Sequence, residues 1–238
     1  MEKNNKTVIV SGCTKGIGRA ICEHFASAGF SVSGFARRKK DIEEMNHSFC
    51  ERYSQQQFLF LTADASIKDE VLEFASQVKN KFKTIDILVN NAGVFLPGNI
   101  LEEEPGIIEK LIGTNLYSAY HLTREIVPLM ISQKSGSVFN MCSIASIAAY
   151  ENGGSYAISK FALLGFNKQL RVETQNNNIK VTAIIPGATL TESWEGSNLP
   201  ESRFIKPEDI AKTILSVYLL SDQTDVEEII IRPQLGDL

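Results

Sequence analysis

Short runs of β-branched and apolar residues alternate with longer amphipathic stretches along the whole chain, and this alternation restricts the fold more than any other feature. Each short run has the length and composition of one strand, and each long stretch repeats its apolar residues at helical intervals. We expect strands at residues 6–12, 30–36, 57–63, 86–93, 136–143, 180–187 and 227–233. We expect helices from about Gly16, through 43–53, through 71–82, from Pro105 towards Met130, through 156–173 and from Pro207.

The expected strands read as nearly continuous apolar runs, which indicates burial on both faces. Such strands occur in parallel sheets whose two faces are covered by helices, with right-handed crossovers between successive strands. The sequence therefore predicts an α/β fold in which a doubly wound, seven-stranded parallel sheet carries helices on both faces.

The chain is expected to form a single domain over residues 1–238, because 43% hydrophobic residues are enough to build one core of this size. No repeat, low-complexity tract or linker interrupts the order of the elements. The only long irregular stretch covers about residues 187–206 and is rich in Gly, Ser, Thr, Pro and Glu. A loop of this length inside a compact domain is expected to be a substrate lid or a disordered segment.

The charge balance excludes some classes of partner. A net charge of -4 argues against binding to a phosphate backbone, so we expect a small-molecule substrate and no nucleic acid. No apolar run approaches the ~18 residues that a membrane span requires, and the N-terminal stretch shows no signal-peptide pattern. We therefore expect no membrane partner.

The cysteines and histidines give no pattern of a disulfide framework or a metal site. We expect free thiols in a reducing compartment and hence a cytoplasmic protein, because the cysteines are scattered over Cys13, Cys22, Cys50 and Cys142. We expect no metal, because the histidines lie far apart and lack neighbouring ligands at metal-site spacing. They are His24, His47 and His121.

The loop after the first strand reads SGCTKGIG and is the first candidate ligand site, because ligands of open parallel sheets bind beyond the carboxyl ends of the strands. Its glycines precede a helix whose first backbone amides are placed to face an anion. The spacing departs from the G-x-G-x-x-G fingerprint, and tight packing of strand against helix would also explain these glycines. The expected cofactor contacts are Gly12, Thr14, Lys15, Gly16, Ile17 and Gly18.

The loop after the second strand favours NADP(H) over NAD(H). An acidic residue here would bind a ribose 2′-hydroxyl, whereas this chain reads GFARRKK and delays the first acid to Asp41. Arg37 or Arg38, together with Lys15, can hold a 2′-phosphate, for which a guanidinium offers two parallel hydrogen bonds. A solvated basic run at the start of a helix is the alternative interpretation.

Several further motifs follow in order along the chain. The set comprises Gly12-x-x-x-Gly16-x-Gly18, Asn90-Asn91-Ala92-Gly93, Asn115, Ser143, Tyr156-x-x-x-Lys160 and Pro186-Gly187. With these motifs the chain resembles the short-chain dehydrogenase/reductase family over its whole length. The resemblance implies a Rossmann-type fold and an oxidoreductase that uses NADP(H).

The resemblance also implies a catalytic tetrad. Tyr156 would donate or accept a proton, and Lys160 would lower its pKa and hold the cofactor ribose. Ser143 would bind the carbonyl oxygen of the substrate, and Asn115 would support a water-mediated proton relay. For Ser143 the alternative is a cap at the end of a strand, and the rival hydroxyls are Ser146, Ser155 and Ser159.

The pairing of Tyr156 with Lys160 has a physical rationale, because residues four apart on a helix share a face. Moving the pKa of a tyrosine from ~10 to about 7 takes roughly 4 kcal/mol of preferential stabilisation of the tyrosinate. A unit charge about 4 Å away supplies roughly that amount at an effective dielectric constant near 20. The lysine would thus make the phenol an acid and base usable near neutral pH.

The family pattern implies more cofactor contacts, for which ordinary turn chemistry is the alternative. Asp64 would lie beside the adenine ring. The cleft would be lined by Asn90, Ala92 and Gly93. The carboxamide or the phosphates would be reached from Pro186, Gly187, Thr189 and Thr191.

The segments PGATLTESW and VEEIIIRPQLGDL are similar to bacterial members of the family that are sepiapterin reductase-like. This implies an NADPH-dependent carbonyl reductase acting on a ketone, a dicarbonyl or a pterin side-chain carbonyl, with Trp194 stacking on the substrate or anchoring the lid. A 3-ketoacyl-type reductase, an alcohol dehydrogenase and a catalytically idle NADP(H)-binding protein remain open. The family further implies a homodimer or homotetramer formed through helices at about 106–130 and 156–173.

Overall fold

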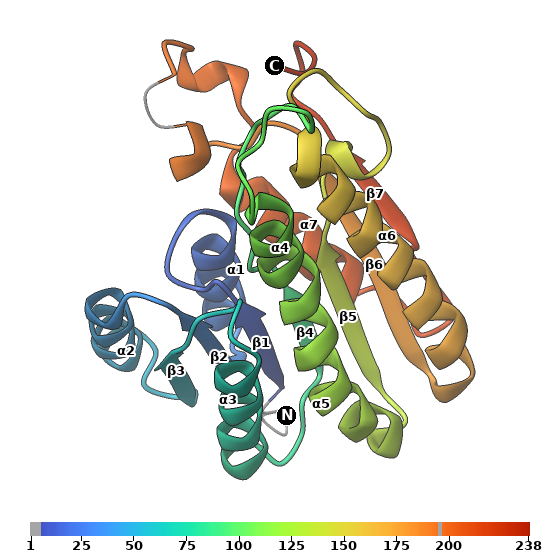
Figure 1. The fold of residues 1–238 in the computed structure, drawn as a ribbon. Coiled ribbons are helices and arrows are strands. Elements are labelled where there is room, and N and C mark those ends of the chain that lie inside the picture. Colours follow the sequence, from blue (N-terminus) through green and yellow to red (C-terminus); the bar gives the residue numbers. More distant parts are fainter. Residues whose placement is uncertain (1–5, 195–196) are drawn as a thin grey trace.

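The seven strands form one parallel sheet in the order β3-β2-β1-β4-β5-β6-β7, as Figure 1 shows. The structure is a computed structural model that describes residues 6–194 and 197–238. The strands are β1 (Thr7–Ser11), β2 (Ser31–Ala36), β3 (Phe58–Thr62), β4 (Ile87–Asn90), β5 (Gly136–Met141), β6 (Ile179–Pro186) and β7 (Glu228–Ile231). This order confirms the expected Rossmann-type sheet, in which the direction of strand addition reverses between β1 and β4.

The helices follow the expected alternation. They are α1 (Gly16–Ser27), α2 (Lys39–Arg52), α3 (Lys68–Lys81), α4 (Ile107–Ile112), α5 (Ser118–Gln133), α6 (Gly154–Thr174) and α7 (Pro207–Tyr218). The single long helix expected from Pro105 differs from the observed one, because a π-helical segment, η1 (Gly113–Tyr117), separates α4 from α5. Such π-turns within helices often occur at functional sites.

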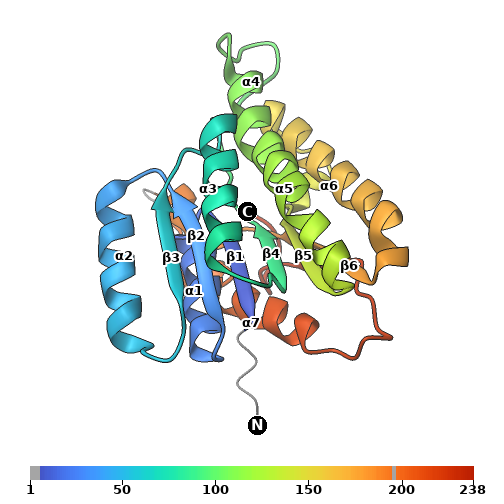
Figure 2. The same ribbon diagram turned by 90° about the horizontal axis from the view of Figure 1, so that it is seen from below.

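Helices cover both faces of the sheet, and Figure 2 shows α3, α5 and α6 on the face opposite α1 and α7. The strand side chains alternate between the two cores: Val8 and Val10 of β1 join the core under α1 and α7, and Ile9 joins the core under α3 and α5. All three side chains are fully buried, which stabilises the fold by about 1.5–3 kcal/mol for each one relative to exposure.

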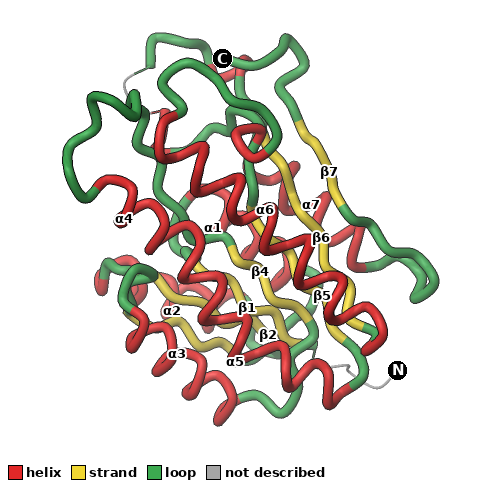
Figure 3. Tube along the Cα trace, turned by 45° about the vertical axis from the view of Figure 1, so that its right-hand side comes forward, coloured by secondary structure: helices red, strands yellow, loops and turns green. Residues whose placement is uncertain are grey.

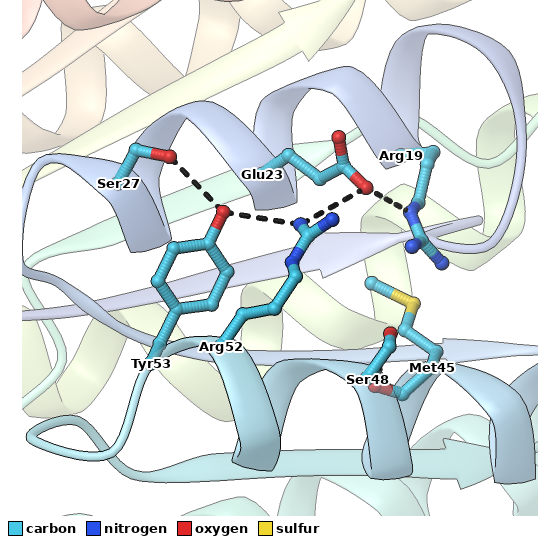
Figure 4. A network of polar contacts seen from close by, with 7 residues as sticks. All are labelled: Arg19, Glu23, Ser27, Met45, Ser48, Arg52 and Tyr53. Atoms are coloured by element: carbon cyan, nitrogen blue, oxygen red, sulfur yellow. Dashed lines mark hydrogen bonds and ion pairs between the residues drawn. The ribbon is translucent and has the colours of Figure 1, made fainter.

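A polar network joins α1 to the end of α2, and Figure 4 shows it in detail. Glu23 accepts a hydrogen bond from Arg19 at 2.8 Å and forms an ion pair with Arg52 at 3.4 Å. The hydroxyl of Tyr53 lies 3.1 Å from both Arg52 and the Ser27 hydroxyl. These contacts join α1, which begins in the glycine-rich loop, to the end of α2, which begins after Arg38. Each contact contributes little stability, because it lies at the surface.

The start and the end of the expected lid at 187–206 are joined to each other. Thr189 forms a parallel bridge with Ile205, whose amide donates to the carbonyl of Ala188 at 3.0 Å. Residues 195–196 of this segment lie outside the described residues. Figure 3 shows how this loop and the other loops at the carboxyl ends of the strands gather at one end of the molecule.

Helices long and apolar enough to cross a membrane are absent from the part of the chain that the structure describes.

Candidate active site

A cleft of about 1000 Å³ lies at the carboxyl ends of the strands, where the topology of the sheet favours a ligand. The loops after β1 to β6 contribute to its walls. Of the residues expected from the sequence, those that line it are Gly12, Thr14, Lys15, Gly16, Ile17, Gly18, Arg37, Arg38, Asp64, Ala92, Gly93, Ser143, Tyr156, Lys160, Pro186, Gly187, Thr189, Thr191 and Trp194. Asn90 and Asn115 are not among them.

The glycine-rich loop has the shape that a phosphate cradle requires. Gly12 has a φ of +69°, and a Cβ atom on Gly18 would overlap the carbonyl oxygen of Gly12. The residue before α1, Lys15, gives no side-chain cap, so no capping side chain covers the first amides of the helix. The first turn of α1 also contains no acidic residue, so these residues fit the pyrophosphate of a dinucleotide.

Three cations, Lys15, Arg37 and Arg38, lie in the cleft wall formed by the loops after β1 and β2. Lys15 and Arg38 both form ion pairs with Glu192 from the expected lid, and the distance from Arg38 Nη2 to Glu192 Oε1 is 3.6 Å. The Nε atom of Arg38 also lies 2.8 Å from a carboxylate oxygen of Asp41. Arg37 is exposed at the rim. Lys15 and Arg38 are thus already paired with carboxylates, whereas Arg37 has no ion pair among the residues that the structure describes.

Asp64 lies in the cleft wall, and its side chain also stabilises a turn, which is the alternative role named for it from the sequence. Its Oδ1 atom accepts hydrogen bonds from the amide and the hydroxyl of Ser66, each at 2.8 Å. The carboxylate therefore shapes the loop after β3 while it faces the cleft.

The expectation that Asn90 lines the cleft is wrong, and its neighbour Asn91 takes that place. Asn90 is buried beneath the cleft, where its Nδ2 atom donates to Thr123 and to Asn140 at 3.0 and 2.8 Å. Asn91 instead donates to the carbonyl of Ser11 at 2.9 Å and thereby fixes the glycine-rich loop. Asn90 is the last residue of β4, and Asn91 is the first residue of the loop beyond it, which lines the cleft.

Lys160 is the most unusual charged residue of the site, because its side chain is buried with 5% exposure. Its Nζ atom donates to the carbonyl of Met141 at 2.8 Å and lies 5.9 Å from the ring centre of Tyr156. Burial lowers the pKa of the Lys160 ammonium to about 8. The ammonium is thus still mostly protonated at neutral pH.

The phenol of Tyr156 behaves differently from the expectation. Burial raises its pKa above the ordinary value, and the nearby Ser143 hydroxyl offsets only part of this rise. The expected lowering by Lys160 does not occur in the protein alone: the Ser143 hydroxyl is the group that lowers this pKa, and burial outweighs it. The ring of Phe95 packs edge-on against the Tyr156 ring, with centroids 4.8 Å apart, and contributes to this burial.

Among the candidate hydroxyls, only Ser143 lines the described part of the cleft wall. Ser146 accepts from the amide of Ser143 at 3.1 Å, Ser155 binds Glu103, and Ser159 donates to the carbonyl of Tyr156 at 2.7 Å. Ser143 also caps the short helix that follows β5, where its Oγ atom accepts from Ala145 at 3.2 Å. It is therefore both a strand-end cap and a cleft residue.

Asn115 lies behind the cleft and joins two of its walls. From the π-helical η1, its Nδ2 atom donates to the Ser159 hydroxyl at 2.9 Å, and its Oδ1 atom accepts from the Val94 amide at 2.8 Å. The side chain is 1% exposed. It thus fixes the loop after β4 against α6, and its part in a water-mediated proton relay stays a prediction.

Trp194, an expected cleft residue, packs against Phe204 with ring centroids 5.2 Å apart.

Sequence reasoning missed several other residues of the cleft. The missed residues include the aromatic side chains Phe95 and Tyr150 and the ion pair of Arg232 with Asp237. Their only signal in the sequence is their position in loops after β4, β5 and β7. No group of residues within 6–194 and 197–238 has the composition and geometry of a metal site.

A doubly wound sheet, a glycine-rich loop and a buried lysine beside a tyrosine and a serine are together typical of oxidoreductases that use nicotinamide dinucleotides. The family model for short chain dehydrogenases matches residues 6–202. The chain belongs to the short-chain dehydrogenase/reductase family and is an oxidoreductase that acts on alcohol and carbonyl groups.

Relatives with known names match nearly the whole chain. A sepiapterin reductase from Chlorobaculum tepidum is 32% identical, and the match covers 97% of each chain. A 3-oxoacyl-acyl-carrier-protein reductase from Haemophilus influenzae is 30% identical, with 91% of each chain covered. The solved structure of L-sorbose reductase from Gluconobacter frateurii, complexed with NADPH and L-sorbose, is 26% identical with a TM-score of 0.87 and covers 96% of this chain and 95% of that one.

Proposed function

We propose that this protein is an NADPH-dependent carbonyl reductase that transfers hydride between NADP(H) and a ketone, a dicarbonyl or a pterin side-chain carbonyl. One observation carries the proposal: Ser143, Tyr156 and Lys160 line the same cleft as the glycine-rich loop. The reacting groups and the phosphate cradle are thus parts of one continuous site.

The roles of the three side chains follow from their chemistry. A bound nicotinamide would supply or accept the hydride. Tyr156 donates a proton to the substrate oxygen during reduction, and burial keeps its phenol protonated at neutral pH, which is the form that donation requires. Ser143 donates a hydrogen bond to the same oxygen, on which negative charge develops. Lys160 holds a positive charge beneath the ring of Tyr156.

The preference for NADP(H) is supported by the cations at the adenosine end. Lys15, Arg37 and Arg38 line the cleft there, and NADPH is the cofactor named for the L-sorbose reductase complex. We expect NADPH to be used more efficiently than NADH, and we expect Arg37→Asp to reduce this preference by about tenfold or more through the loss of a charge-assisted contact. Steady-state kinetics with both cofactors test this. Equal use of the two by the wild-type enzyme would contradict the proposal.

The substrate class rests on similarity and on the aromatic side chains of the cleft. The sepiapterin reductase relative acts on a pterin according to its name, and Phe95, Tyr150 and Trp194 supply flat apolar surfaces in this cleft. A 3-oxoacyl-type reductase is the second candidate, because a relative with that name is 30% identical. Loss of NADPH absorbance with sepiapterin, a vicinal diketone and a 3-ketoacyl thioester separates the two. NADPH binding without turnover of any carbonyl would support a catalytically idle protein instead.

We further propose that the protein works as a homo-oligomer in the cytoplasm. Exposed apolar side chains on one side of the molecule support an assembly through η1, α5 and α6. They are Tyr117, Tyr120, Ile158, Phe161 and Val172. The cytoplasm is proposed because the four cysteines lack the spacing of a disulfide framework. Light scattering that shows only a monomer would refute the assembly.

A further inference from the structure

We propose that Glu192 determines how strongly the cleft prefers a 2′-phosphorylated cofactor, because it competes with that phosphate for the same cations. The inference rests on the proposed use of NADP(H) and assigns a specificity-determining role to an acidic residue of the 187–206 segment.

The contacts of Glu192 bring together three segments that are far apart in the sequence. Its Oε1 atom forms ion pairs with Lys15 of the glycine-rich loop and, at 3.6 Å, with Nη2 of Arg38 after β2. All three side chains line the cleft. The Glu192 side chain is 50% exposed, so the pairs lie at the surface of the cleft and can exchange for another anion.

The backbone around Glu192 is held against the glycine-rich loop. A Cβ atom placed on Gly16 would come within 2.9 Å of the side chain of Thr191, the residue before Glu192. The bridge between Thr189 and Ile205 ties the start of the same segment to its end. The fold of this segment therefore places the Glu192 carboxylate beside the cations.

A 2′-phosphate and the Glu192 carboxylate cannot both have full use of Lys15 and Arg38, since two neighbouring anions repel each other. Arg38 is already shared with Asp41 at 2.8 Å. Within the described part of the chain, Arg37 has no ion-pair partner and is free to meet the phosphate first. Glu192 must then leave its cations, which weakens NADP(H) binding. NAD(H) carries no phosphate there and does not incur this cost.

The test is calorimetric binding of 2′,5′-ADP and 5′-AMP to the wild-type protein and to Glu192→Gln. Glutamine keeps the size of the side chain and removes its charge. We expect Glu192→Gln to bind 2′,5′-ADP about three- to tenfold more tightly, and 5′-AMP with a change of less than about twofold. Raising the salt concentration should reduce the gain, because screening weakens the competition.

Glu201→Gln is the matched control, because Glu201 lies in the same segment and has no ion pair among the residues that the structure describes. It should leave both affinities unchanged. When Glu192→Gln is added to Lys15→Met, the gain for 2′,5′-ADP relative to Lys15→Met alone should be smaller than in the wild-type background, since one of the two contested cations is gone.

Two results would overturn the inference. If Glu192→Gln binds 2′,5′-ADP no more tightly while the wild type prefers it over 5′-AMP, Glu192 is not a competitor and the NADP(H) proposal survives. If neither protein prefers 2′,5′-ADP over 5′-AMP, the cofactor proposal and the inference fail together.

Discussion

At the scale of single residues, Lys160 shows the clearest conflict between stability and function. A buried ammonium loses hydration, and this loss lowers the pKa of Lys160 from 10.5 to about 8. One hydrogen bond to the carbonyl of Met141 is its main compensation. This loss of hydration falls at the position where we propose that a fixed positive charge beside Tyr156 assists the reaction.

The pH dependence of stability tests this account of Lys160. Between pH 8 and 10.5 the unfolded state binds more protons at Lys160 than the folded state does. The destabilisation caused by the buried ammonium therefore decreases as the pH rises, and the free energy of unfolding increases. From pH 7 to 9.5 we expect the unfolding free energy of the wild type to rise by about 2 kcal/mol relative to Lys160→Met. Urea titrations at both pH values measure it. A parallel pH profile for the two proteins would contradict the burial of a charged lysine.

At the scale of elements, the start of α6 positions Tyr156, the proposed proton donor. Glu103, in the loop before α4, accepts hydrogen bonds from the amide of Ser155, at 2.8 Å, and from its hydroxyl. A carboxylate at this end also complements the helix dipole. Because Tyr156 is the next residue, this cap is expected to hold the first turn of α6.

We therefore expect Glu103→Ala to lower the unfolding free energy by about 1–2 kcal/mol and to reduce kcat, through loss of the cap. Chemical denaturation and steady-state kinetics measure the two effects. Glu104→Ala is the control, because Glu104 is exposed and its side chain has no hydrogen bond or ion pair among the described residues. Equal behaviour of the two variants would show that the cap does not support α6.

The sequence predicts elements better than it predicts which side chain of a loop reaches the cleft. The strands and the loops after them are predictable, because apolar runs define parallel strands and these bring their carboxyl ends together. The exchange of Asn90 for Asn91 comes from a shift of one residue, which periodicity does not resolve. Glu192 could not be foreseen, since its partners lie in segments more than a hundred residues away, at Lys15 and Arg38.

At the scale of the whole molecule, the sheet order explains why so many functional residues meet. Every strand is parallel, so the glycine-rich loop after β1, the cations after β2 and the serine after β5 all reach one end. The expected lid and the C-terminal residues Asp237 and Leu238 add to the same cleft. The C-terminus lies at this end in Figure 1. One cleft is therefore the proposed site of both the cofactor and the substrate.

The most direct test of the central claim is the kcat of Tyr156→Phe with NADPH and the best carbonyl substrate. The account predicts a loss of about 10²–10⁴-fold, because phenylalanine keeps the ring and its packing against Phe95 but has no proton to donate. Calorimetry should show that the variant still binds NADPH, which confirms an intact cleft. A Tyr156→Phe enzyme that retains most of the wild-type kcat would contradict the account.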